Sequence, residues 1–137
     1  MVTINDSTLN ANVWKTVYDL LVAANLESST ATVTAAFIDN HTAFPQVVIN
    51  PIEVSRSEGT IDSTMTAHTK EISVLIDLYA KKASQIDTLN DAISHLLLTT
   101  NIPGITLVSA DSGSGQGIDP NGNKIHVLSL TFNYKRR

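Results

Sequence analysis

Cysteine is absent from this chain of 137 residues. Its absence excludes disulfide bonds, zinc sites with thiolate ligands and catalysis by a thiol nucleophile. Charged residues are scarce as well, at 16% of the chain, against roughly 25% in most soluble domains. No apolar run approaches the roughly 18 residues that a membrane-spanning helix needs, and residues 1–6 lack the basic and apolar segments of a signal peptide. We therefore expect a soluble protein that is made in the cytoplasm and has no membrane partner.

Basic residues are too few and too dispersed for a nucleic-acid-binding surface. The formal net charge is −4, whereas binding to a phosphate backbone needs clustered Lys and Arg side chains. The one basic cluster is Lys135-Arg136-Arg137. It can be read either as a solubilising tail or as a contact with a partner.

Motifs that carry chemistry are missing. The four histidines lie far apart and form no zinc-binding pattern. The Gly-rich stretch 113–117 leads into a strand-like segment, whereas a phosphate-binding loop opens a helix. Asp111, Asp119, Asn121 and Asn123 could offer oxygen ligands to calcium, but the ligand order of an EF-hand is absent and ordinary turn chemistry explains them. We predict no catalytic residue, no cofactor and no metal, and hence no enzyme.

Two segments have the apolar spacing of amphipathic helices, residues 8–24 and residues 84–99. Ser84 stands where it could cap the second helix. Trp14 and Tyr18 lie on a stripe beside the apolar face of the first helix. Core packing and a contact between subunits both account for these two aromatic residues.

Strand-like patterns fill much of the remaining chain. They cover residues 31–37, 44–54, 71–79, 105–110 and 125–134. Between them, the polar residues 55–69 are predicted to form a long loop or arm, and residues 111–123 a long hairpin loop with a turn at Asn121-Gly122. The order predicts one domain over residues 1–137 with an α+β fold. We expect a largely antiparallel or mixed sheet of about five strands, with two helices packed on one face and long hairpin loops or arms.

The stretch Phe44-Pro45-Gln46-Val47-Val48-Ile49-Asn50-Pro51 combines a strand-like centre with a proline near each end. Proline has no backbone donor for a sheet, so it is confined to strand starts, bulges and edges. We predict that Pro45 begins the strand and that Pro51 marks a break or bulge before residues 52–54. The segment should then lie toward a sheet edge.

Three segments carry a resemblance to a known family. They are Phe44-Pro45-Gln46-Val47-Val48-Ile49, Glu71-Ile72-Ser73-Val74-Leu75-Ile76-Asp77-Leu78-Tyr79-Ala80 and Ile86-Asp87-Thr88-Leu89-Asn90-Asp91-Ala92-Ile93. In order and spacing, the chain resembles the tail terminator (tail completion) proteins of long-tailed bacteriophages. The likeness covers nearly the whole chain, and it is one of pattern and length.

The resemblance implies a structural protein of the virion tail or neck that is assembled in the host cytoplasm. Such proteins form a ring, usually a homohexamer, which caps the head-proximal end of the tail tube. The ring stops tube polymerisation and provides the head-to-tail joining surface. The implied partners are further copies of the chain, the tail tube protein and a head-closure or connector protein. DNA would pass through the ring without sequence-specific binding.

On this resemblance, the arm, the hairpin loop and the basic C-terminal residues are candidate contacts with other subunits or partners. The candidates are Arg56, Glu58, Ile61, Met65, His68, Gln116, Ile118, Asn121, Lys135, Arg136 and Arg137. Two alternatives stay open. One is another neck or tail component, such as a head-closure or connector protein or a tail-tube subunit. The other is a small ligand-binding module that uses the Gly-rich loop as a lid.

Overall fold

The computed structural model describes residues 4, 7–24, 26, 31–36, 44–57, 69–118 and 124–136. Its two helices are α1 (Leu9–Ala23) and α2 (Ala83–Thr99). Its six strands are β1 (Thr32–Thr34), β2 (Gln46–Ile49), β3 (Glu53–Ser57), β4 (Thr69–Ala80), β5 (Thr106–Ile118) and β6 (Lys124–Arg136).

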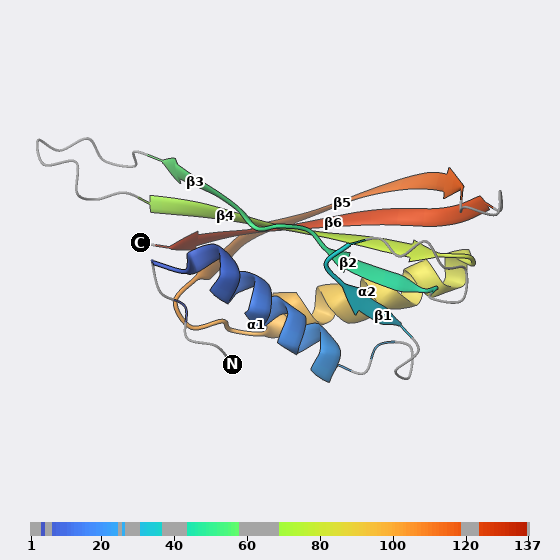
Figure 1. Cartoon of the computed structure of the whole chain (residues 1–137), viewed down its shortest axis with the longest axis horizontal. Coiled ribbons are helices and arrows are strands. Elements are labelled where there is room, and N and C mark those ends of the chain that lie inside the picture. Colours follow the sequence, from blue (N-terminus) through green and yellow to red (C-terminus); the bar gives the residue numbers. More distant parts are fainter. Residues whose placement is uncertain are drawn as a thin grey trace, which may run out of the picture.

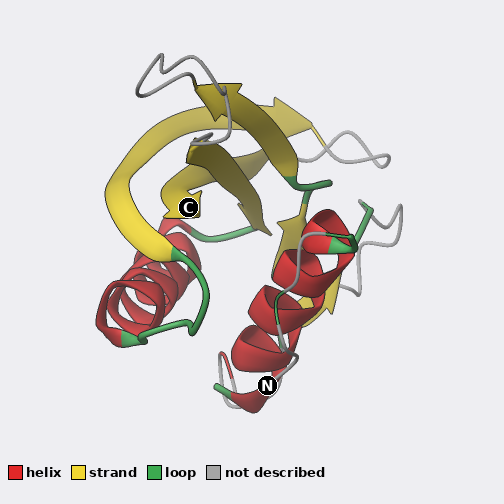
Figure 2. Ribbon diagram, turned by 90° about the vertical axis from the view of Figure 1, so that its left-hand side faces the viewer, coloured by secondary structure: helices red, strands yellow, loops and turns green. Residues whose placement is uncertain are grey.

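The strands form one mixed sheet in the order β1-β2-β4-β6-β5, and β3 pairs with β4. Only the β1–β2 pair is parallel among the described strands. Both helices lie on the same side of the sheet (Figure 1), and the sheet arches over them (Figure 2). The predicted α+β fold is therefore confirmed. The sheet has one strand more than expected because the segment 44–54 divides into two strands.

That division occurs at Pro51, as the sequence predicts. Both β2 and β3 pair with β4, but Ile49 lies opposite Ile76 whereas Glu53 lies opposite Ser73. Residues 50–52 thus face only two residues of β4, which is the geometry of a β-bulge. The backbone N–H of Asn50 still donates to the Leu75 carbonyl, at 3.0 Å, so the bulge keeps a hydrogen bond at its start.

The predicted edge position is correct for β3 and wrong for β2. Among the described residues β3 pairs with β4 alone, whereas Gln46, Val47 and Val48 pair with β4 on one side and with β1 on the other. Strand β1 precedes β2 in the chain and is separated from it by a connecting segment. The sequence pattern of β2 alone therefore does not reveal that β1 pairs with it. The Phe44–Pro45 peptide bond is cis.

Four further boundaries differ from the prediction. Helix α2 begins at Ala83, so Lys82 and not Ser84 occupies the N-cap position, without a side-chain capping hydrogen bond. Strand β1 ends at Thr34, well before residue 37. Strand β5 continues to Ile118, so the described part of the predicted hairpin loop is a strand paired with β6. The predicted arm is also shorter than expected, because residues 55–57 belong to β3.

The hydrophobic core lies between the sheet and the two helices. Side chains from alternate positions of β4 and β6 meet the apolar stripes of α1 and α2. The largest fully buried apolar members are Val13, Val17, Leu21, Ile49, Ile72, Ile76, Leu78, Leu89, Ile93, Leu97 and Phe132. Burying a side chain of this size stabilises the fold by about 1.5–3 kcal/mol.

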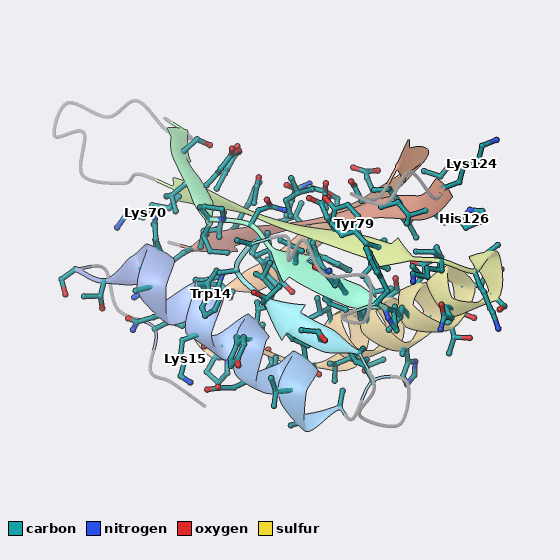
Figure 3. All side chains as sticks on the ribbon, turned by 45° about the vertical axis from the view of Figure 1, so that its right-hand side comes forward. Trp14, Lys15, Lys70, Tyr79, Lys124 and His126 are labelled. Atoms are coloured by element: carbon teal, nitrogen blue, oxygen red, sulfur yellow. The ribbon has the colours of Figure 1, made fainter. Side chains whose placement is uncertain are left out.

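Trp14 links α1 to the sheet by a hydrogen bond and by packing. Its indole Nε1 donates a hydrogen bond of 3.1 Å to the backbone carbonyl of Ile49, and its ring stacks on Tyr18 with the centroids 5.1 Å apart. Both rings pack against the core, which favours the packing explanation of this aromatic pair. Lys15 projects from the same helix away from the sheet (Figure 3) and pairs with Asp19 at 2.9 Å. The hydrogen bond and the charge of Asp19 raise the pKa of Lys15.

In the portion of the chain that the structure describes, neither helix combines the length and the hydropathy needed to cross a bilayer.

Candidate interaction surfaces

The sheet face turned away from the helices is named here the outer face. Because side chains alternate along each strand, the strand register assigns its described members. They are Gln46, Val48, Glu53, Ser55, Glu71, Ser73, Leu75, Asp77, Tyr79, Thr106, Ser109, Asp111, Gly113, Gly115, Gly117, Ile125, Val127, Ser129, Thr131, Asn133 and Lys135. Most of them are polar and at least partly exposed, whereas Gln46, Val48 and Ile125 are buried. Over most of its area the outer face can therefore meet water or a polar partner.

Hydrogen bonds between side chains cross the outer face from strand to strand. The Ser73 hydroxyl donates to Asn133 Oδ1 at 3.0 Å, and Asn133 Nδ2 donates to Ser109 Oγ at 3.0 Å. These bonds link β4, β6 and β5. Such cross-strand polar pairs stabilise a sheet modestly, by about 0.2–1 kcal/mol each.

Asp77 is the centre of a second polar group on the outer face. One carboxylate oxygen accepts from the Ser129 hydroxyl at 2.6 Å, and the other accepts from Asn50 Nδ2 at 2.9 Å. The same amide donates to the Leu75 carbonyl at 3.2 Å. Asn50 thereby ties the bulge to the outer face. Burial, followed by the nearby charge of Asp77, raises the pKa of Tyr79.

A hollow of about 420 Å³ opens on the outer face near the start of β5. Its lining combines hydroxyl, amide and charged groups with one exposed apolar side chain, Val108, which is the extra residue of an irregularity in β5. The lining residues are Ser55, Glu71, Ser73, Val108, Ser109, Asn133, Tyr134 and Lys135. A second hollow, of about 490 Å³, lies at the N-terminal end of α1 beside Val54 and Lys70.

Two of the three basic C-terminal residues are part of the sheet. Lys135 and Arg136 are the last two residues of β6, so they do not form a free solubilising tail. The Arg136 guanidinium donates to the Gly104 carbonyl at 2.9 Å, and Gly104 adopts a left-handed φ of 98°. Lys135 is exposed on the outer face, opposite Glu71 of β4 and Thr106 of β5. A contact role for these two residues remains a prediction.

Few of the other predicted contact residues belong to the described part of the structure. Arg56 lies in β3, and Gln116 and Ile118 lie in β5, but only their backbone is described. Six more candidates lie outside the described residues: Glu58, Ile61, Met65, His68, Asn121 and Arg137.

The sequence prediction missed the length of β5 and the exposed edge that this length creates. One signal for it was present. Gly113, Gly115 and Gly117 recur at every second residue, which is the period of a strand.

Within the described ranges, no three His, Asp or Glu side chains come close enough together to share a metal ion. The titratable groups of the outer face are instead spread along its strands.

No protein-family model matches the chain, and no curated protein matches it. Among solved structures, the fold is shared with a chain from a particle described as the virion of a native gene transfer agent (GTA). The two chains align with a TM-score of 0.56 over 88% of this chain and 90% of the other, at 17% sequence identity. At this level of identity, the likeness establishes a common fold.

Proposed function

We propose that this protein is a structural subunit of a virion, and that it acts as a tail terminator. The observation that carries the proposal is the shared fold: nearly the whole chain aligns with nearly the whole of a chain from a gene transfer agent virion. The sequence resemblance to phage tail terminators points to the same class of particle independently of that alignment. In this role the protein forms a ring, usually of about six copies, at the head-proximal end of the tail tube.

The mechanism requires a ring whose two ends differ. A contact between different surfaces of neighbouring copies closes into a ring when the rotation between them permits it. One end of the ring then binds the last layer of tube protein, and the other end presents a surface that tube protein does not recognise. Polymerisation stops, and the free end receives the head-closure or connector protein.

Passage of DNA through the ring would need no recognition of base sequence. Among the described side chains of the outer face, the charged groups are the carboxylates of Glu53, Glu71, Asp77 and Asp111 and the ammonium of Lys135. Negative charge on a surface repels phosphate. The balance on this face therefore supports a role without stable DNA binding.

The test adds the purified protein to tail tube protein of the same virus while the tube polymerises. We expect tubes that stop lengthening and carry a ring at one end in electron micrographs. Heat-denatured protein serves as the control and should leave tube growth unchanged. Tubes that keep lengthening without rings at their ends would contradict the proposal, and incorporation along the tube body would identify a tube subunit instead.

A further inference from the structure

The outer edge of β5 is a long strand edge that the described chain leaves open. We propose that this edge pairs with β3 of a second copy, so that the sheet continues from one subunit into the next. The inference rests on the proposed ring, since it specifies the contact by which neighbouring copies join.

The first observation concerns the strand itself. Strand β5 spans 13 residues, Thr106–Ile118, and within the described part of the chain it pairs only with β6. Every second residue of an edge strand directs its backbone N–H and C=O groups outward, where another strand can bind them. The side chains from Val108 to Gly115 are all exposed, on both faces of the strand. Figure 1 shows β5 along one margin of the sheet.

The second observation is that β5 lacks most of the features that protect free edges. Proteins usually block an edge with lysine, proline, a very short strand or a bulge. From Ser109 to Ile118 the strand has regular register with β6 and contains neither lysine nor proline. Its one irregularity lies at its start, between Leu107 and Ser109.

The third observation concerns two glycines of β5. A Cβ atom added to Gly113 or Gly115 would meet nothing within 4 Å, and neither residue has the left-handed backbone found at Gly104. The described chain therefore supplies no steric reason for glycine at these positions, although glycine weakens a strand. Side chains stand perpendicular to the sheet, so glycine at these positions leaves the outer surface of β5 open. The side chains of an adjoining strand can occupy that space.

Strand β3, on the opposite side of the sheet, runs in the direction needed for antiparallel pairing with β5. Strand β5 is antiparallel to β6, β6 is antiparallel to β4, and β4 is antiparallel to β3. It follows that β3 runs opposite to β5. A second copy placed with its β3 beside β5 therefore forms an antiparallel pair, and its helices stay on the same side of the extended sheet. The contact joins two different surfaces, as closure of a ring requires.

Charge indicates where along β5 the partner strand lies. Glu53 and Ser55 of β3 belong to the outer face, and so does Asp111 of β5. Like charges directly opposite each other destabilise a strand pair. Glu53 of the second copy should consequently avoid Asp111. The register with Ser55 opposite Gly113 and Glu53 opposite Gly115 meets this condition, and it is the one that we propose.

A cross-linking experiment tests the pairing. Because the chain contains no cysteine, the double variant Ser55→Cys/Gly113→Cys has one thiol on each proposed edge, both on the outer face. Within one chain these two positions are three strand spacings apart across the sheet and six residues apart along it, about 24 Å in all, which is too far for a direct disulfide. Mild oxidation of the assembled protein, either free rings or tubes capped by them, should give a ladder of disulfide-linked oligomers on a non-reducing gel. Each single variant and the control Ser84→Cys/Gly113→Cys, with its second thiol on the exposed start of α2, should give no ladder.

The outcomes separate this inference from the proposed function. Rings that form and cap tubes without any ladder in the Ser55→Cys/Gly113→Cys variant would overturn the edge pairing and leave the terminator role standing. Dimers from Gly113→Cys alone would overturn it in favour of a two-fold β5–β5 contact. Failure to cap tubes would instead overturn the terminator role, and a ladder would still support the edge pairing.

A second variant tests the same edge without cross-linking. Gly113→Lys/Gly115→Lys adds two side chains in open space, so the circular dichroism spectrum of the single chain should be unchanged. Assembly, followed by analytical ultracentrifugation, should weaken at least tenfold. The matched control Ser84→Lys/Ala92→Lys adds the same charge to exposed positions of α2 and should assemble normally. Normal assembly of the glycine variant would overturn the pairing.

Discussion

Tyr134 shows how a single residue can couple stability to pH. It lies on the inner side of β6 with only 2% of its surface exposed, and its hydroxyl has no hydrogen-bond partner among the described residues. Burial disfavours the charged phenolate and raises the pKa of Tyr134 from 10.0 to about 12. The folded chain thus holds this proton to a higher pH than the unfolded chain does.

This difference predicts a loss of stability in alkali. As pH rises from the unfolded pKa of 10.0 to the folded pKa of about 12, the unfolded state loses its proton first, and the free energy of unfolding falls by about 2–3 kcal/mol. The Tyr134→Phe variant should lack this contribution. At pH 7 its stability should equal or slightly exceed that of the parent, since it removes a buried hydroxyl without a partner. Urea denaturation at pH 7 measures the second effect. At pH 11, midway between the two pKa values, it should show about half of the alkaline loss, about 1.4 kcal/mol.

Tyr18→Phe is the matched control for this measurement, because it removes a phenol from the partly exposed stripe of α1. It should retain the alkaline loss of the parent. A Tyr134→Phe variant that loses as much stability in alkali as the parent would disprove the assignment.

At the scale of the element, the bulge between β2 and β3 sets which side chains of β3 face the core. With one extra residue on this strand, Val54 pairs with Ile72 and packs against the core, whereas Glu53 and Ser55 join the outer face. A shift of register by one residue exchanges the two faces of a strand. The bulge is therefore required for the correct orientation of β3.

Insertion of one alanine after Pro51 should destabilise the protein by about 2 kcal/mol or more, because β3 must then either lose its pairing or turn Val54 outward. Pro51→Ala keeps the residue count at this exposed position, so its effect should stay within about 1 kcal/mol. Urea denaturation followed by circular dichroism compares the two variants. Equal midpoints for both would show that the extra residue does not set the register.

The elements also show what sequence reveals and what it does not. Period and composition predict both helices, the position of β4 and the break at Pro51, because each depends on local preference. The extent of β5 depends on β6, which pairs with Gly113 and Gly115 in spite of their low strand preference. The pairing of β1 with β2 likewise joins two separate segments of the chain, so the local pattern of β2 does not predict it.

For the candidate surfaces too, local sequence predicts some features, whereas others depend on contacts between distant segments. Charge and composition single out the basic residues near the C-terminus, but the bond from Arg136 to the Gly104 carbonyl joins residues 32 positions apart. The bond from Ser73 to Asn133 joins residues 60 positions apart. No local pattern encodes either contact, so the sequence predicts the residue types of a surface better than their arrangement.

At the scale of the whole molecule, one hydrophobic cluster joins both helices to the sheet. A single core of this kind predicts cooperative unfolding. Trp14, the only tryptophan, reports on the contact of α1 with β2, and far-ultraviolet circular dichroism reports on all elements. The two signals should have the same urea midpoint.

Phe132→Leu should lower both midpoints together, by about 1–3 kcal/mol in free energy of unfolding, because Phe132 is 1% exposed in the shared core. Its neighbour Thr131 lies on the outer face, and Thr131→Ala should change stability by about 0.5 kcal/mol or less. Separate midpoints for fluorescence and circular dichroism would show that the chain unfolds in parts.

Placement of both helices on one side of the sheet has a consequence for evolution. Substitutions on the inner side are constrained by packing, while those on the outer face are constrained only by the surfaces that they meet. A lineage can therefore exchange its partners by altering one layer of side chains and still inherit the same backbone. Such separation is one way in which two chains that are 17% identical can have the same fold, because much of the sequence can vary without disturbing the packing of the core.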